Sequence, residues 1–155
     1  MLIFEPKALN SSAFLFAIAL ATVTSLFSAA NFSAATSIAL SASRSLAEFI
    51  FEVKEWCRNP YGGVHGGIIS AVFDTTMGMG AVGMTKQFVT TTDINVSFLR
   101  AMNADKYIFR IDYTQVGKRL VRCMGKAIDA ETGEVAATAM ASFMTLDNKP
   151  KGIQV

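Results

Sequence analysis

The chain has 155 residues, of which 52% are hydrophobic, and this length is typical of a single domain with a buried core. Its 14 basic and 12 acidic residues leave a formal net charge of +2 and are spread along the sequence, which excludes the strongly basic surface of a typical nucleic-acid-binding protein. The two cysteines, Cys57 and Cys123, are too few for a disulfide framework, and no His/Cys cluster indicates a metal site.

The first part of the chain, residues 1–45, contains a long uncharged segment, because no charged residue occurs between Lys7 and Arg44. Three interpretations are open: an apolar helix over residues 11–30 packed on the fold or on another subunit, a signal peptide within residues 1–30, or a membrane anchor within residues 11–42. The weak positive charge before the apolar run and the polar residues within it favour the helix. We therefore expect a cytoplasmic protein, with export as the alternative.

Residues 46–146 show the periodicities of an α+β domain, and residues 147–155 form a tail. Alternating apolar and polar residues predict a strand from Leu46 to Trp56, and apolar residues at helical spacing predict a buried helix over Gly66–Gly83. Period-two alternation predicts four more strands, in segments 92–98, 107–116, 120–129 and 135–145. Because the connections are short, neighbouring strands are expected to pair as antiparallel hairpins, in a sheet that wraps around the helix.

The most informative segment runs from Asn59 to Gly67 and reads NPYGGVHGG, with Asp74 following in the predicted helix. Two glycines that open a helix leave backbone N–H groups at its positive end, where they suit a developing oxyanion; alternatively they only permit a tight turn. Asp74 is a carboxylate in an otherwise apolar helix. It is a candidate general base or nucleophile, and the alternative is a helix-edge side chain hydrogen-bonded to a loop.

His65 is the only histidine, and we interpret it as structural, with a ring nitrogen bonded to the backbone of the glycine turn. No second imidazole and no G-x-S-x-G elbow is present, so a serine-hydrolase triad is not expected. Gly66 and Asp74 are eight residues apart, roughly 12 Å along a helix. If both act on one carbonyl, a two-fold dimer must bring Gly66 of one subunit to Asp74 of the other.

Three segments in order resemble the hotdog-fold acyl-CoA thioesterases of the phenylacetate-pathway (PaaI-like) and human thioesterase-superfamily-member type. They are NPYGGVHGGIISAVFDTTMGMGA, TTTDINVSFLR and VGKRLVRCMGKAIDAETGEVAATAMASF. The resemblance covers about residues 46–146. It implies an antiparallel sheet wrapped around one long central helix, and homodimers joined edge to edge, commonly as dimers of dimers. It also implies hydrolysis of acyl-CoA without a metal or other cofactor.

The resemblance also implies roles for individual residues. The Gly66 N–H and the Asn59 side chain would hold the thioester carbonyl, Asp74 would activate water or attack directly, and Thr91 would help to position that water. The residues implied to contact the substrate form three groups: His65 and Gly67 at the turn, Phe98, Leu99 and Arg100 after the next strand, and Gly117, Lys118 and Arg119 in a basic turn whose cations suit the phosphates of CoA.

Two other functions stay open at this point. A hotdog dehydratase would need a histidine placed differently relative to its carboxylate, and an acyl-CoA-binding sensor would bind the ligand without turnover. The presence of both Asn59 and Asp74 favours catalysis. The sequence does not decide which acyl group is preferred.

Overall fold

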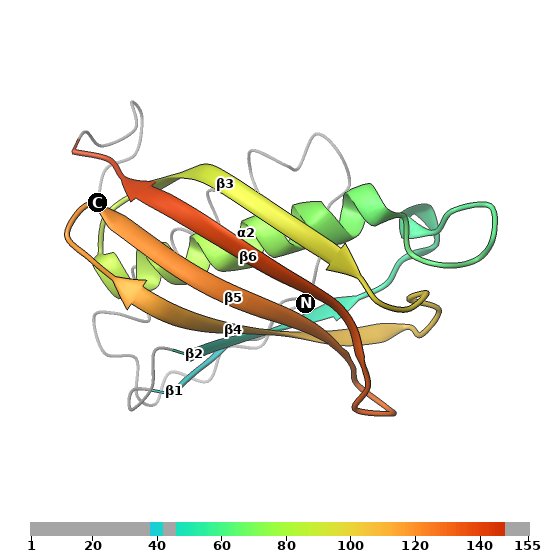
Figure 1. The fold of residues 1–155 in the computed structure, drawn as a ribbon. Coiled ribbons are helices and arrows are strands. Elements are labelled where there is room, and N and C mark those ends of the chain that lie inside the picture. Colours follow the sequence, from blue (N-terminus) through green and yellow to red (C-terminus); the bar gives the residue numbers. More distant parts are fainter. Residues whose placement is uncertain (1–37, 42–45, 148–155) are drawn as a thin grey trace.

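The structure, a computed structural model, describes residues 38–41 and 46–147, which form one antiparallel sheet and one long helix (Figure 1). In chain order the elements are β1 (Ile38–Ser41), β2 (Leu46–Glu52), the 3-10 helix η2 (Glu55–Cys57), α2 (Gly66–Thr85), β3 (Val89–Phe98), β4 (Lys106–Val116), β5 (Leu120–Asp129) and β6 (Val135–Thr145). The helix expected over residues 11–30 lies outside the described residues. The sheet begins with β1, which lies within residues 1–45, outside the predicted domain of residues 46–146.

The sheet buries one face against α2, as the α+β pattern predicts. Along β2, β4 and β5 buried residues alternate with exposed or half-buried ones, so each strand presents every second side chain to the helix. Phe73 of α2 packs edge-on against Phe109 of β4, with ring centroids 4.7 Å apart. Within the described residues α2 is the one helix long and apolar enough to span a membrane, but it is the core helix of this sheet.

The strand order is β1-β2-β4-β5-β6-β3, which differs from the expected succession of hairpins. β4, β5 and β6 are joined as predicted, but β3 pairs with β6 at one edge of the sheet rather than with β4. The hairpin expected between β3 and β4 is therefore wrong. β3 and β4 lie on opposite sides of the helix, and the chain crosses from β3 to β4 near the start of α2 (Figure 1). This arrangement lets one sheet cover the helix from both sides.

Two element ends also differ from the prediction. β2 stops at Glu52 instead of continuing to Trp56, because its partner β4 begins at Lys106, the residue opposite Glu52. α2 continues two residues past the predicted end at Gly83 to Thr85, and Lys86 caps it in the left-handed conformation (φ 58°). Gly80 lies inside the helix at a close contact: a Cβ there would lie 1.7 Å from the hydroxyl oxygen of Tyr113, which donates a 2.9 Å hydrogen bond to the carbonyl of Met77.

Candidate functional site

His65 is the N-cap residue of α2 and holds the turn before the helix. Its ring Nδ1 accepts a 3.0 Å hydrogen bond from the Gly67 N–H, and its own backbone N–H donates to the carbonyl of Cys57 at 2.8 Å. The structural role predicted for His65 is confirmed. Because the ring engages the Gly67 N–H, this glycine does not supply the free donor that the Gly-Gly pair suggested.

Gly66 does supply one. No described residue accepts a hydrogen bond from the Gly66 N–H, which lies in the first position of α2 and so at the positive end of the helix dipole. The ring of Phe98, the last residue of β3, lies against this glycine: a Cβ added to Gly66 would be 3.3 Å from Phe98 Cζ. A group that binds this N–H would therefore meet an aromatic ring beside it.

Asn59 belongs to a tightly bonded loop just before His65. Its side-chain Oδ1 accepts a 2.9 Å hydrogen bond from the Tyr61 N–H, and its backbone N–H donates to Gly63 O at 2.7 Å. The Arg58 guanidinium fastens the loop to the β3–β4 connection through Asn103 O and the Asp105 carboxylate, at 3.1 and 2.6 Å. With Oδ1 engaged, the amide Nδ2 is the group of Asn59 that can donate to a ligand.

The carboxylate of Asp74 is held by the hydroxyl of Thr91, which donates a 2.7 Å hydrogen bond to Oδ1. Asp74 is half-buried, on the part of α2 that faces β3. Thr91 reaches it because β3 has a bulge at Thr92. Thr91 is in register with Phe143, whose ring packs on α2, whereas Asp93 is in register with Ser142 on the opposite face of the sheet. Without the bulge, Thr91 and Asp93 would share a face.

Within one chain these groups form two separate half-sites. We call Asn59, Gly66 and Phe98 the donor half-site, and Asp74 with Thr91 the carboxylate half-site. Gly66 and Asp74 are eight positions apart along α2, which corresponds to roughly 12 Å. Thr91 and Phe98 are seven positions apart along β3, which corresponds to roughly 20 Å. One thioester carbonyl cannot contact both half-sites of the same chain.

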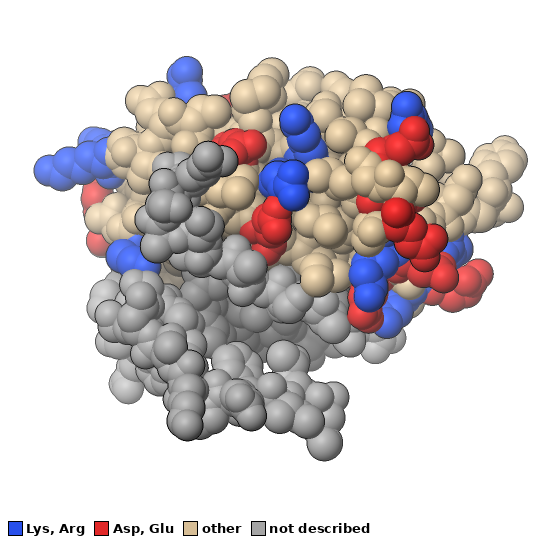
Figure 2. Space-filling view, turned by 90° about the horizontal axis from the view of Figure 1, so that it is seen from below, with Lys and Arg blue, Asp and Glu red and all other residues tan. Residues whose placement is uncertain are grey.

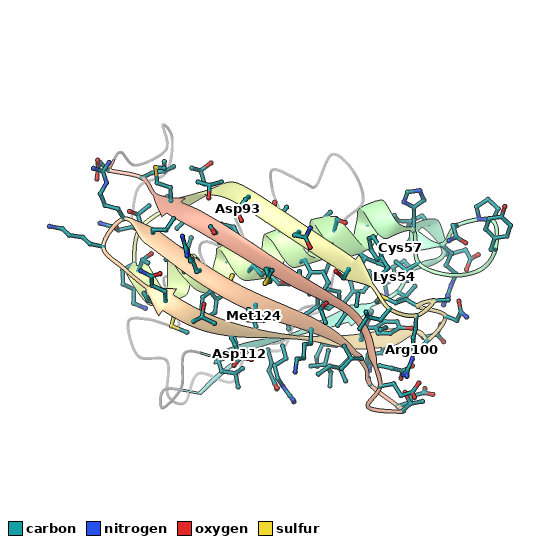
Figure 3. All side chains as sticks on the ribbon, in the orientation of Figure 1. Lys54, Cys57, Asp93, Arg100, Asp112 and Met124 are labelled. Atoms are coloured by element: carbon teal, nitrogen blue, oxygen red, sulfur yellow. The ribbon has the colours of Figure 1, made fainter. Side chains whose placement is uncertain are left out.

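The residues predicted to contact CoA also divide between the two ends of the sheet. Phe98, Leu99 and Arg100 lie at the end where α2 begins, and Figure 3 places Arg100 at the same end as Cys57. The basic turn of Gly117, Lys118 and Arg119 joins β4 to β5 at the other end, where Thr145 donates hydrogen bonds to two carbonyls of this turn. Leu120, next in the chain, is in register with Met144, which pairs with Thr90 beside the carboxylate half-site.

The cations of these two groups differ in their partners. Arg100 pairs with Glu134 at 2.8 Å, and both side chains are more than half exposed, so the pair stabilises little. Lys118 and Arg119 form no ion pair with any described residue. The face seen in Figure 2 carries basic and acidic side chains side by side, rather than a single-sign patch.

Sequence reasoning missed the exposure of β3. Among the strands that the structure describes, this edge strand pairs only with β6, and nearly all of its residues are exposed, among them Ile94 at 36% and Phe98 at 54%. Exposed apolar residues on an unpaired strand edge are typical of interaction surfaces. The signal in the sequence was the alternation of Ile94, Val96 and Phe98, which predicts a buried face but not what buries it.

The two cysteines do not take part in either half-site. Both are free and buried, and burial raises the pKa of Cys123 to about 12. A thiol with so high a pKa is almost entirely protonated at neutral pH and is a poor nucleophile. Asp74 is therefore the better candidate for the reacting group.

Comparisons with known proteins agree with this geometry. Residues 61–136 match the Thioesterase superfamily. The structure is similar to the PaaI protein of the Escherichia coli phenylacetic acid degradation operon, with a TM-score of 0.72 and 16% identity over 90% of this chain and 96% of that one. A phenylacetic acid degradation-related protein of Ralstonia eutropha JMP134 has a TM-score of 0.69 and 22% identity, over 84% and 99% of the two chains.

A third similar structure was solved with a ligand. This protein of Streptococcus mutans is bound to acetyl-CoA and has a TM-score of 0.65 and 15% identity, over 74% of this chain and 91% of that one. No curated protein sequence matches the chain. The helix wrapped by a sheet and the matched segment agree: this chain has the hotdog fold, and its residues 61–136 match the thioesterase superfamily.

Proposed function

We propose that this protein is an acyl-CoA thioesterase whose active site joins the carboxylate half-site of one subunit to the donor half-site of another. The observation that carries the proposal is the pairing of Asp74 with Thr91, because it orients a carboxylate within a thioesterase-superfamily fold. The acetyl-CoA bound to the Streptococcus mutans protein supports acyl-CoA as the class of ligand.

The chemistry needs few groups. The thioester carbonyl would accept hydrogen bonds from the Gly66 N–H and Asn59 Nδ2, which stabilise the negative charge that develops on its oxygen. Asp74 would either take a proton from water as the water attacks the carbonyl carbon, or attack that carbon itself to give an anhydride that water then cleaves. The carbon–sulfur bond breaks, the CoA thiolate takes up a proton, and the products are a free acid and CoA. The proposed reaction uses no metal or other cofactor.

Sharing the site between subunits requires a particular pairing of two β3 strands. Antiparallel pairing that sets Thr91 opposite the partner subunit's Phe98 places the two-fold axis at Asn95, because the extra residue of the bulge, Thr92, takes no partner of its own. The same pairing covers the exposed apolar residues of the edge and brings each donor half-site to the carboxylate half-site of the other subunit. The homodimer is thus part of the proposal, and a homotetramer would be a further association of such dimers.

The proposed dimer also reunites the residues predicted to contact CoA. Phe98 to Arg100 of one subunit would approach the end of the sheet that carries Lys118 and Arg119 of the other. Two cations that form no ion pair with a described residue suit the phosphates of CoA, which lie far from the thioester. We therefore place the acyl group near the half-sites and the nucleotide near the basic turn. A cytoplasmic location fits a CoA ester as substrate and is part of the same proposal.

The test measures release of free thiol from a panel of acyl-CoAs by wild type and by Asp74→Asn, with acyl-CoA binding measured in parallel. We expect turnover that the substitution abolishes while binding persists. If the folded wild type binds acyl-CoA but does not hydrolyse it, the proposal of an enzyme is wrong and the protein is an acyl-CoA-binding sensor. Release of water from a 3-hydroxyacyl substrate would instead indicate a dehydratase, although the only histidine already caps α2.

A pair of substitutions at Gly66 tests the oxyanion donor. Proline is well tolerated in the first position of a helix and removes the N–H, and the extended backbone of His65 (φ −62°, ψ 132°) is compatible with a following proline. Gly66→Ala adds the same Cβ but keeps the donor, so it is the matched control. We expect Gly66→Pro to lower kcat by about 100-fold relative to Gly66→Ala.

Subunit complementation tests the shared site. Gly66→Pro and Asp74→Asn chains, each inactive alone, are coexpressed with different affinity tags, and the doubly tagged dimer is purified. In that dimer one site carries both lesions and the other carries neither, so about half of the wild-type activity is expected. Absence of activity in a dimer that binds acyl-CoA would show that each site lies within one chain.

A further inference from the structure

Phe98 bounds the space beside the free N–H of Gly66. Three atoms of its ring, Cζ, Cε1 and Cε2, lie 3.3, 3.6 and 3.7 Å from the position that a Gly66 Cβ would occupy. The ring therefore lies at contact distance from the space that the missing side chain leaves. In a single subunit Phe98 is 54% exposed, so part of its surface can contact a ligand held between this subunit and its partner.

The backbone holds this ring in place. Phe98 is in register with Ala137 of β6, and the next two residues, Leu99 and Arg100, both donate their N–H groups to the carbonyl of Ala136, at 2.9 and 3.0 Å. These two hydrogen bonds to one carbonyl hold the end of β3 in place at the point where the chain leaves the sheet. The position of Phe98 relative to α2 is thus set by the sheet and not by a free loop.

The ring continues an apolar surface along β3. Ile94 and Val96 precede Phe98 at every second position, on the face of the strand that looks toward α2, and Val96 packs against the core. A carbonyl bonded to Gly66 N–H has an acyl carbon on one side and sulfur on the other. The acyl carbons are apolar, whereas the chain that leads from the sulfur to the nucleotide carries amides that need polar partners. An apolar wall therefore suits the acyl side.

From these contacts we infer that Phe98 is a specificity-determining residue, which touches the acyl carbons next to the thioester carbonyl and limits branching there. This inference rests on the proposed thioesterase function and adds the selectivity of its donor half-site. The ring leaves room for a linear chain beside Gly66 and opposes a substituent on the carbon next to the carbonyl. Removal of ring volume should then admit branched acyl groups.

The experiment compares butyryl-CoA with its α-branched isomer isobutyryl-CoA, in wild type, Phe98→Leu and Phe98→Ala. We expect the ratio of kcat/KM for the branched over the linear substrate to rise by about 10-fold or more in the variants, since one or two methyl groups in an apolar pocket are worth at least that much. Met140→Ala is the matched control, because Met140 is equally exposed, at 55%, but lies on the outer face of the sheet.

A ratio that stays constant in both variants would overturn the inference, as would an equal rise of KM for both substrates, which would place the ring against the CoA arm. The same ratio is also read from binding of the two esters in the Asp74→Asn background. Selectivity can then be judged apart from turnover. If the folded wild type hydrolyses neither ester, the proposed function fails; if hydrolysis occurs and only the ratio fails to move, the role of Phe98 fails.

Discussion

The hydroxyl of Thr91 donates a 2.7 Å hydrogen bond to Asp74 across the space between β3 and α2, and this bond depends on a bulge one residue further along the strand. It leaves the second carboxylate oxygen of Asp74 without a bond from any described residue. A carboxylate that is oriented through one oxygen can use the other toward water or a carbonyl carbon. Thr91 thus acts as a positioning residue in the proposed reaction.

Replacing Thr91 by valine should weaken catalysis without weakening the fold. Valine has nearly the same shape but cannot donate, and Thr91 is exposed, so we expect kcat to fall about 10-fold with little change in thermal stability. Thr91→Ser keeps the hydroxyl and should retain most of the activity. Steady-state kinetics and thermal unfolding of the three proteins provide the measurement. Equal loss in serine and valine variants would show that the methyl group, not the hydrogen bond, matters.

His65→Ala should destabilise the protein by about 1 kcal/mol, because the side chain caps α2 by accepting from the Gly67 N–H. Asparagine is a good N-cap residue, so His65→Asn should restore the stability in urea unfolding. It should also restore most of the activity that the alanine variant loses through distortion of the Gly66 turn. If His65→Asn is stable yet inactive, the imidazole takes part in the chemistry.

Gly80→Ala should lower the free energy of unfolding by about 3 kcal/mol. A Cβ at this position would lie 1.7 Å from the Tyr113 hydroxyl oxygen and 2.6 Å from its ring carbon Cζ, and the buried ring has little room to retreat. Alanine at the half-buried Thr75 on the same helix is the control and should change stability little. The free energies of unfolding of both variants are measured in denaturant. Equal stability of Gly80→Ala and the Thr75 control would show that the Tyr113 ring moves away without a cost in free energy.

The protein should lose stability in alkaline solution partly through Cys123. Burial raises the pKa of its thiol from 9.0 to about 12 in the folded state, so above pH 9 the unfolded chain binds fewer protons than the folded one. The stability that the buried, protonated thiol contributes is fully present below pH 9 and is lost as pH rises toward 12. The free energy of unfolding of Cys123→Ala should therefore fall less steeply than that of wild type between pH 9 and 11.

Burial also raises the pKa of Tyr113, so the free energy of unfolding of Cys123→Ala still falls as pH rises. The comparison therefore concerns the difference between the two slopes. Identical slopes in wild type and Cys123→Ala would show that the thiol is not protected from water in the folded protein.

Much of the fold could be predicted because it depends on local periodicity. The helix beginning at Gly66 and the strands β4, β5 and β6 follow from apolar spacing, and their boundaries lie within a few residues of those expected. The structural role of His65 also follows from neighbouring residues alone, since the N-cap bond joins positions two apart. Local patterns of this kind are present in the sequence before any tertiary contact forms.

Only the tertiary structure decided the rest. The placement of β3 beside β6, the bulge that turns Thr91 toward Asp74, and the contact of Phe98 with Gly66 each join segments far apart in the chain. Such contacts depend on how the whole sheet curves around α2 to bury it, and no window of neighbouring residues encodes that packing. By itself the sequence determined which elements form and which residues are candidates for the chemistry, whereas packing decided which of those residues meet.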